Sequence, residues 1–371
     1  MHPALNHHRR LILKIGLLGY GTVGRSVATL LQERNLGIEI KSILRRPGKA
    51  TQPGMTEQIE SILADPEIDC VVEVLSGTEP ALDYITRAIK AGKHVVSANK
   101  AALAANFAGL MNLAREHHVH LLFEASCGGG IPWIENLKKA ARLDQIHSAS
   151  GILNGTSNYI LDQMEANSLS FQAALEQAQQ LGYAEADPTA DIAGFDVRNK
   201  ALISATLAYG LKSIREDFPV AGIEKLSGEI MQSFLKENKV LRLMMFSRRE
   251  DHRYALAVVP VVCPAGSLEH AVKRNFNAVR LEGDIVGPLL FVGQGAGGAP
   301  TADAVIQDLL SIAGDRVEPV DLTNELTYDA SLLSGTGYFG NGQSRQGTLH
   351  ELIEQAHQDD TFLAFEPNQL E

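Results

Sequence analysis

The chain has 371 residues, of which 45% are hydrophobic and 21% are charged. This length predicts two or three domains, and the composition excludes a disordered or collagen-like chain. The net charge of −11 argues against a nucleic-acid partner, and the sequence has no apolar run of about 18 residues that would cross a membrane. Three scattered cysteines and an opening MHPALNHHRR without signal-peptide features lead us to expect a cytoplasmic protein.

Short apolar runs alternate with helical patterns through the first 125 residues, as is typical of a parallel sheet covered by helices on both faces. Right-handed crossovers then predict a doubly wound α/β fold. The predicted strands are a run from Leu11 to Gly19, Ile38–Leu44, Asp69–Leu75, His94–Ala98 and His120–Ala125, and the predicted helices are Thr22–Glu33, Pro80–Ala91 and Ala101–His117.

The pattern changes after three consecutive glycines at 128–130, and the following region predicts a mixed α+β domain. We expect a connector helix at Pro132–Ala141 and a helix at Val197–Tyr209 among others. The predicted organisation is a doubly wound domain at 1–145 with a return segment at about 296–340, a mixed α+β domain at 146–295, and a C-terminal tail at 341–371. The glycine-rich stretch TGYFGNGQSRQGT is predicted to be a loop, and a last helix is predicted at Thr348–His357.

A GxGxxG motif follows the first predicted strand and opens the first predicted helix, the context in which this motif binds a dinucleotide. The first glycine makes the tight turn, the second admits the pyrophosphate, and the third lets the helix pack on the strand. A strand–turn–helix without ligand is the alternative. The motif is Gly19, Tyr20, Gly21, Thr22, Val23 and Gly24.

Two arginines, Arg45 and Arg46, follow the second predicted strand, where an NAD-binding chain usually carries an acidic residue. Guanidinium groups suit the 2′-phosphate of NADP(H). We therefore favour NADP(H) over NAD(H), with a solvated basic loop as the alternative.

Two further segments end predicted strands at the edge where ligands bind in open α/β sheets. Lys100 follows the fourth strand, where a lysine opposes the dipole of the helix that begins there. The segment EASCGGGIP, which begins at Glu124, combines a carboxylate with glycine carbonyls, and such oxygens suit a cation. A surface lysine and a flexible hinge are the respective alternatives.

The densest group of charged residues runs from Gly182 to Lys200 and includes Glu185, Asp191 and Asp196. Asp196 and Lys200 are four residues apart on a predicted helix and so share one face. The carboxylates fit an amino-acid ammonium group, and a protonated lysine can donate to a carbonyl being reduced. The alternative is a plain i,i+4 salt bridge on a helix, which contributes only about 0.3–0.5 kcal/mol.

Six separated segments together resemble the homoserine dehydrogenase family, over roughly residues 12 to 315. They are GLLGYGTVG, GKHVVSANKAAL, EASCGGGIP, LNGTSNYIL, GYAEADPTADIAGFDVRNKALI and GQGAGGAPTADAV. The resemblance implies reversible NAD(P)H-dependent reduction of L-aspartate 4-semialdehyde to L-homoserine, in threonine, methionine and isoleucine biosynthesis. It also implies a homodimer or higher oligomer, with a dinucleotide-binding domain at 1–145 and a substrate-binding and dimerisation domain at 146–295.

The resemblance also assigns roles to matching residues. Lys100 and Lys200 would be the two catalytic lysines of the active site, with Lys200 as the general acid and Lys100 near nicotinamide and substrate. Asp196, the third catalytic residue, would position Lys200 or the substrate. Glu185 and Asp191 would bind the substrate. Ser76 and Gly295 would bind the cofactor together with the GxGxxG residues. A monovalent cation, Na⁺ in this family, would be bound by Glu124, Cys127, Gly129 and Ile131.

The chain also departs from the family. Only some 55 residues follow Gly314, so we expect no C-terminal regulatory domain of the ACT type, and position 127 is Cys where Val is expected. Two other functions stay open: a related amino-acid oxidoreductase with the same cofactor domain, and an NADP-binding regulator whose site has drifted.

Overall fold

The computed structural model describes residues 12–368, which form two compact units. Unit 1 comprises the chain up to Ser126 and residues 297–319, and unit 2 comprises residues 127–296 and the chain from Val320 onward. Leu11, with which the first predicted strand begins, lies outside the described residues. No helix within residues 12–368 is long and apolar enough to span a membrane.

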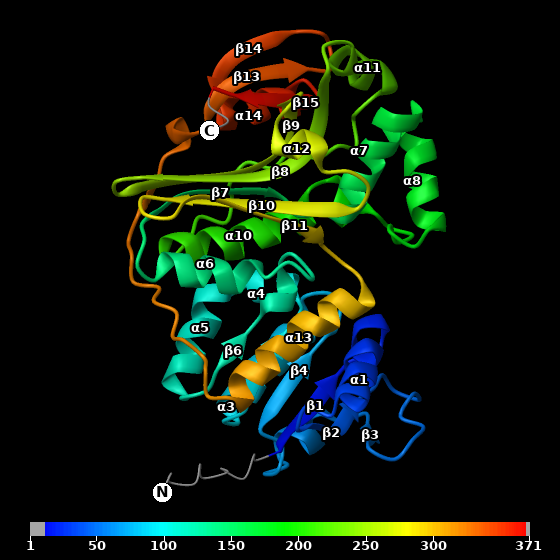
Figure 1. Cartoon of the computed structure of the whole chain (residues 1–371), viewed down its shortest axis with the longest axis vertical. Helices are drawn as coiled ribbons and strands as arrows, with labels where there is room; N and C mark the ends of the chain where they lie inside the picture. The colour runs from blue at the N-terminus through cyan, green and yellow to red at the C-terminus, as the bar shows by residue number, and fades with distance from the viewer. Residues whose placement is uncertain (1–11, 369–371) are drawn as a thin grey trace, which may run out of the picture. The chain divides into compact units, whose positions relative to one another are not determined.

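Unit 1 is a doubly wound α/β unit, as predicted. Its six parallel strands have the order β3-β2-β1-β4-β5-β6, and α1 and α13 lie side by side on one face of the sheet (Figure 1). The strands are β1 (Leu13–Leu18), β2 (Ile38–Leu44), β3 (Met55–Thr56), β4 (Cys70–Glu73), β5 (His94–Ser97) and β6 (Leu121–Leu122). The helices are α1 (Thr22–Arg34), α2 (Ile59–Leu63), α3 (Ala81–Lys90), α4 (Lys100–Ala104), α5 (Phe107–Glu116), η1 (Glu124–Ser126) and α13 (Gly298–Ala313).

The helix predicted over Ala101–His117 is in fact two helices, α4 and α5. Asn106 interrupts it, with φ −158° and ψ 48°, which is not a helical conformation. The Asn106 side chain fills the space beside Gly109, where a β-carbon would lie 2.2 Å from its amide oxygen. The apolar periodicity continues across this break, so the sequence pattern alone did not reveal it.

Unit 2 contains a mixed sheet of nine strands in the order β11-β10-β7-β8-β9-β15-β13-β14, with β12 paired to β9. The strands are β7 (Ile146–Ile152), β8 (Lys239–Glu250), β9 (Arg253–Pro264), β10 (Phe276–Gly283), β11 (Gly287–Gln294), β12 (Thr327–Tyr328), β13 (Ser334–Phe339), β14 (Ser344–Thr348) and β15 (Leu363–Pro367). The helices are α6 (Trp133–Ala141), α7 (Gly155–Asn167), α8 (Phe171–Gln180), α9 (Thr189–Ile192), α10 (Phe195–Tyr209), α11 (Gly228–Lys236), α12 (Leu268–Ala271), η2 (Ala330–Leu332) and α14 (Leu349–Gln358).

The units divide the chain at different points from the predicted boundaries. The connector helix α6 belongs to unit 2, where the indole nitrogen of Trp133 donates to Ser204 on α10 at 2.9 Å. The return segment ends at Pro319 rather than near residue 340.

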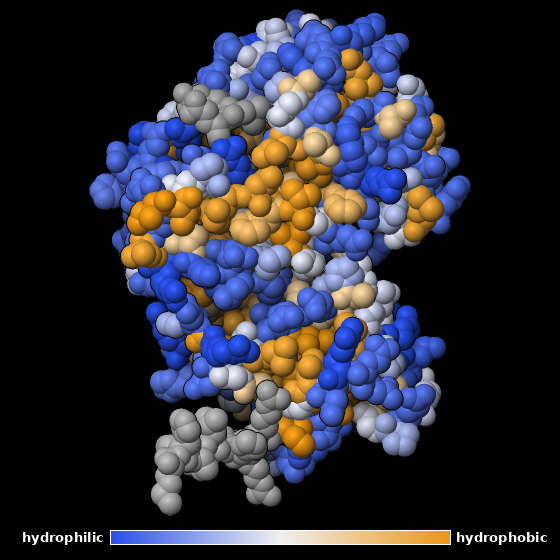
Figure 2. All heavy atoms as spheres, in the orientation of Figure 1, coloured by the Kyte–Doolittle hydropathy of each residue, from blue (hydrophilic) through white to orange (hydrophobic). Residues whose placement is uncertain are grey.

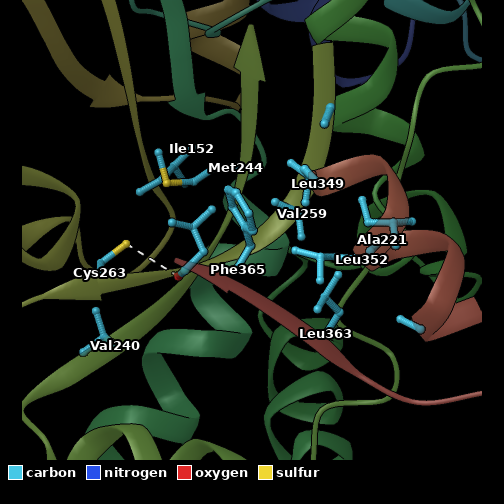
Figure 3. Close-up of a cluster of buried hydrophobic side chains, with 14 of the residues drawn as sticks. Ile152, Ala221, Val240, Met244, Val259, Cys263, Leu349, Leu352, Leu363 and Phe365 are labelled. Atoms are coloured by element: carbon cyan, nitrogen blue, oxygen red, sulfur yellow. Dashed lines mark hydrogen bonds between the residues drawn. The ribbon is translucent and has the colours of Figure 1, made fainter. Parts of the chain in front are cut away.

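The predicted C-terminal tail is part of the sheet of unit 2. Figure 3 shows Leu349, Leu352, Leu363 and Phe365 among the side chains of the unit's core, beside Met244 of β8. The glycine-rich stretch expected to be a loop forms the hairpin of β13 and β14. Gly337 in this stretch allows close packing, because a β-carbon there would lie 2.9 Å from a methyl carbon of Leu352 on α14.

Candidate active site

The GxGxxG residues of unit 1 have the geometry of a phosphate-binding turn. Gly19 has a φ of +102°, and a β-carbon on Gly24 would lie 2.3 Å from the Gly19 carbonyl oxygen, so both positions require glycine. A β-carbon on Gly21 would meet nothing within 4 Å, which leaves open space above the turn. No side chain caps the first turn of α1, to which Thr22 and Val23 belong, so its N–H groups suit a pyrophosphate.

The two predicted cofactor arginines follow β2. The Arg45 guanidinium carbon lies 5.3 Å from the centre of the Tyr20 ring, a cation–π contact with the second residue of the GxGxxG motif. Arg45 is half-buried and Arg46 is exposed. Arg45 is therefore held next to the GxGxxG turn, and Arg46 extends into solvent.

Lys100 is the first residue of α4, and Asn99 caps that helix by accepting a hydrogen bond from the Ala102 amide at 3.1 Å. The Asn99 side chain also donates to the carbonyl oxygens of Leu75 at 3.3 Å and Gly77 at 2.8 Å. These two carbonyls lie on either side of Ser76, so one amide side chain links the loop of Ser76 to the turn of Lys100.

In unit 2, Lys200 and Asp196 form a buried ion pair on α10. The ammonium nitrogen of Lys200 lies 2.7 Å from an Asp196 carboxylate oxygen, and the two side chains are 9% and 6% exposed. Lys200 also donates to the carbonyl oxygen of Leu153 at 2.6 Å. The i,i+4 salt bridge of the alternative is therefore present, but both of its charges are almost fully removed from water, unlike those of an exposed helix pair.

Asn154 connects this ion pair to a second carboxylate, that of Asp191. The sequence analysis did not single out Asn154. Its amide nitrogen donates to Asp196 at 2.9 Å and to Asp191 at 2.7 Å. Its oxygen accepts the Ser157 amide at 2.7 Å and so caps α7. The sequence signal was an asparagine followed by glycine and threonine at a helix start, which predicts a cap but not a bridge between carboxylates.

Glu185 lies in the loop before α9 and is exposed, and its backbone carbonyl accepts a hydrogen bond from Gln179 at 3.1 Å. The first turn of α7 holds the same loop, because the Thr156 hydroxyl donates to the carbonyl of Tyr183 at 2.7 Å. The structure thus gathers Asp191, Asp196 and Lys200 around Asn154, whereas Glu185 sits on a neighbouring loop with its side chain in solvent.

The four residues predicted to bind a cation are divided between the units. Glu124 belongs to unit 1, where its amide donates to Asp308 at 2.9 Å. Cys127, Gly129 and Ile131 belong to unit 2, where Gly129 packs so closely on Gly295 that a β-carbon on it would lie 2.4 Å from the Gly295 carbonyl carbon. Within residues 12–368 no three His, Cys, Asp or Glu side chains form a metal cluster.

A cavity of about 680 Å³ in unit 2 is lined by none of the predicted residues. Phe246, Arg248, Glu250, Arg280 and Glu282 contribute to its walls. The Tyr209 hydroxyl of α10 donates to Ser247 at 2.9 Å, and side chains alternate along a strand. Phe246 and Arg248 therefore face away from α10 and the Lys200 pair.

A doubly wound sheet with a glycine-rich phosphate turn, joined in one chain to a unit with a buried lysine–carboxylate pair, defines an NAD(P)-dependent oxidoreductase. Family models agree: residues 19–124 match "Homoserine dehydrogenase, NAD binding domain" and residues 132–310 match "Homoserine dehydrogenase". The chain belongs to the homoserine dehydrogenase family.

Individual relatives cover most of the chain. It is 38% identical over 320 residues to the homoserine dehydrogenase of Synechocystis, and this alignment covers 82% of this chain and 74% of that protein. It is 39% identical over 312 residues to that of Helicobacter pylori, which spans 81% and 74%. The crystal structure of a homoserine dehydrogenase from Thiobacillus denitrificans superposes with a TM-score of 0.81 at 34% identity, over 88% of this chain and 82% of that one.

Proposed function

We propose that the enzyme reduces L-aspartate 4-semialdehyde to L-homoserine with NADPH, reversibly, and that Lys200 supplies the proton. NADPH, when bound, transfers a hydride from its nicotinamide to the aldehyde carbon. The oxygen of the former carbonyl takes a proton from the lysine, which gives the alcohol. The Lys200–Asp196–Asn154 network is the observation that carries this proposal.

The geometry around Lys200 suits this role. A lysine ammonium has three N–H donors, and the described residues use two of them, on Leu153 and Asp196. The third N–H can donate to the oxygen on which negative charge develops. Asn154 fixes Asp196 in turn, so the lysine is held in one orientation before substrate arrives.

The acidic side chains nearby fit the amino group of the substrate. Glu185, on its exposed loop, would bind the ammonium group, with Asp191 beside the Asn154 bridge. Lys100, which the family motif assigns to the region of nicotinamide and substrate, would contribute a second positive charge.

The first experiment follows NADPH oxidation at 340 nm with L-aspartate 4-semialdehyde and, in parallel, with succinic semialdehyde, which lacks the amino group. We expect a much higher kcat/KM for the amino acid, and we expect Glu185→Gln to remove most of that preference. Equal rates with both aldehydes would indicate a different substrate and favour a related oxidoreductase.

We further propose that the coenzyme is NADP(H), with NAD(H) as a weaker alternative. The half-buried Arg45 beside Tyr20, together with Arg46, would pair with the 2′-phosphate. Arg45→Ala should weaken NADPH binding more than NADH binding, measured by coenzyme fluorescence. Equal losses for both coenzymes would remove Arg45 from 2′-phosphate recognition.

A monovalent cation, Na⁺ in this family, is proposed at the backbone oxygens of Cys127, Gly129 and Ile131 with Glu124. The donor chemistry fits, because carbonyl and carboxylate oxygens are the ligands of hard cations. Gly128 and Gly129 have φ values of +87° and +59°, conformations that turn the local carbonyls out of a regular strand or helix. Replacing Na⁺ by choline should lower the thermal midpoint, and unchanged melting would argue against the site.

A homodimer is also proposed, in the cytoplasm, with the open face of the β11-β10-β7-β8 sheet as its interface. β11 is an edge strand, and Ile285, Val286 and Val292 are 69%, 41% and 54% exposed. Figure 2 shows apolar surface gathered over these strands, the kind of patch that marks an interface. Val292→Asp should shift the sedimentation coefficient toward a monomer, and an unchanged coefficient would exclude this face.

A further inference from the structure

Glu73 is an acid in the interior of unit 1 that the proposed reaction does not use. It ends β4, and none of its surface is exposed. Burial raises the pKa of Glu73, and hydrogen bonds from Ser97, Leu75 and Asn99 oppose that shift. A buried carboxylate is costly unless it is hydrogen-bonded, and an apolar residue would pack the end of a strand without this cost. Its presence calls for a role beyond packing.

The hydrogen bonds of Glu73 reach two neighbouring segments. One carboxylate oxygen accepts the Leu75 amide at 2.7 Å and the Asn99 side-chain amide at 3.4 Å. The other oxygen accepts the Ser97 hydroxyl at 2.6 Å. The Ser97 oxygen in turn accepts the Asn99 backbone amide at 3.1 Å. Glu73 therefore holds both the start of the Leu75–Gly77 loop and the residues just before α4.

Asn99 extends this network to the residues with proposed roles. Its side chain binds the Leu75 and Gly77 carbonyls on either side of Ser76, and its oxygen caps the helix that begins with Lys100. The carboxyl ends of β4 and β5 are register neighbours, with Glu73 opposite Ser97. Ligands of doubly wound folds bind at this edge of the sheet.

We propose that Glu73 is a positioning residue, which fixes the Ser76 loop for the coenzyme and the first turn of α4 for Lys100 through its hydrogen bonds to Ser97 and Asn99. The inference rests on the proposed function insofar as Lys100 and Ser76 contact substrate and coenzyme. Its consequences for coenzyme binding and for the exposure of Lys100 do not require that the substrate be known.

The test compares Glu73→Ala with Glu73→Gln. Glutamine retains the shape, accepts from Leu75 and Asn99 through its oxygen, and donates to Ser97 through its nitrogen. Alanine leaves those donors without their acceptor, which should weaken NADPH binding about tenfold by coenzyme fluorescence. Glu73→Gln should stay within about twofold of the parent, because its oxygen keeps the bonds from Leu75 and Asn99 and only the Ser97 hydroxyl proton loses its acceptor.

A second readout is independent of activity. Lysines are labelled with a limiting amine reagent in the absence of coenzyme and quantified by mass spectrometry, with the exposed Lys90 on α3 as internal control. The half-buried Lys100 should react several-fold faster relative to Lys90 in Glu73→Ala and at the parent rate in Glu73→Gln. A general loss of stability in unit 1 would also raise the labelling of the buried Lys93, which should stay at the parent rate in both variants.

A folded Glu73→Ala protein with parent NADPH affinity and parent Lys100 labelling would overturn the proposal. If Glu73→Ala does not fold, Ser97→Ala removes two hydrogen bonds of the network, those to Glu73 and from the Asn99 amide. This variant should change both readouts in the same direction, by about threefold, and no change in it would also overturn the proposal. Failure of the parent enzyme to reduce the semialdehyde would contradict the proposed reaction, while the binding and labelling results would still decide the role of Glu73.

Discussion

Lys200→Met should destabilise unit 2 by about 3 kcal/mol. The substitution keeps most of the side-chain volume but removes the Lys200 ammonium group from Asp196, whose side chain is 6% exposed. Breaking a buried ion pair by removing one partner costs roughly 3–5 kcal/mol. We expect the lower end, because Asn154 still donates to Asp196 at 2.9 Å.

The assay is urea unfolding followed by the fluorescence of Trp133, the chain's single tryptophan. Trp133 donates to Ser204 on the same helix as Lys200, so its signal reports on that helix. The matched control is Asp83→Ala, which breaks a second i,i+4 pair, Asp83–Arg87, whose side chains are 51% and 36% exposed. That pair lies in unit 1 and in solvent, so the control should leave the Trp133 transition unchanged and shift unfolding followed by circular dichroism by about 0.5 kcal/mol at most.

A double variant should recover part of the stability that Lys200→Met loses. Lys200→Met with Asp196→Asn removes both charges, so it should lose less stability than Lys200→Met alone. A loss under about 0.5 kcal/mol for Lys200→Met, equal to that of an exposed pair, would refute the claim that this ion pair is desolvated.

Three further predictions concern the rest of the chain. Gly24→Ala should abolish NADPH binding measured by fluorescence, since its new carbon would lie 2.3 Å from the Gly19 carbonyl oxygen; binding at parent affinity would contradict the turn geometry. Thr348→Ala removes the capping box of α14 and should lower the free energy of unfolding by about 1 kcal/mol, with Thr327→Ala on β12 as a control; equal small losses would show that the C-terminal helix does not depend on its cap. Burial lowers the pKa of His94 and His120, so the unfolded chain binds more protons just below pH 6.5, and the free energy of unfolding should fall as the pH drops through that value. A His94→Gln variant should show a flatter pH dependence of stability, and an unchanged dependence would contradict this assignment.

Local features of unit 1 could be predicted from the sequence. β2 runs from Ile38 to Leu44 as predicted, and the GxGxxG motif lies in a turn between β1 and α1. Both follow from short-range signals, namely an apolar run and glycines with fixed spacing. The same holds for the common helix face of Asp196 and Lys200, because four residues make about one turn.

The parts that were missed depend on contacts between distant residues. The burial of the Lys200 pair requires α10 to lie against Leu153 and Asn154, more than 40 positions earlier in the chain. The hairpin of β13 and β14 forms because β15 pairs with β13 on the side away from β14. Without that long-range pairing, the glycines of this stretch predict a loop. The hydrogen bonds from Glu73 to the end of β5 likewise form only because β4 and β5 are adjacent in the sheet.

The central claim is that Lys200 donates the proton to the reduced carbonyl. It is tested most directly by single-turnover reduction of L-aspartate 4-semialdehyde with saturating NADPH, comparing the parent enzyme with Lys200→Met and with coenzyme binding measured on the same samples. The account predicts parent-like NADPH affinity and a rate of hydride transfer lower by about 10²–10⁴-fold. A Lys200→Met enzyme that stays folded, binds NADPH and transfers hydride at the parent rate would contradict it.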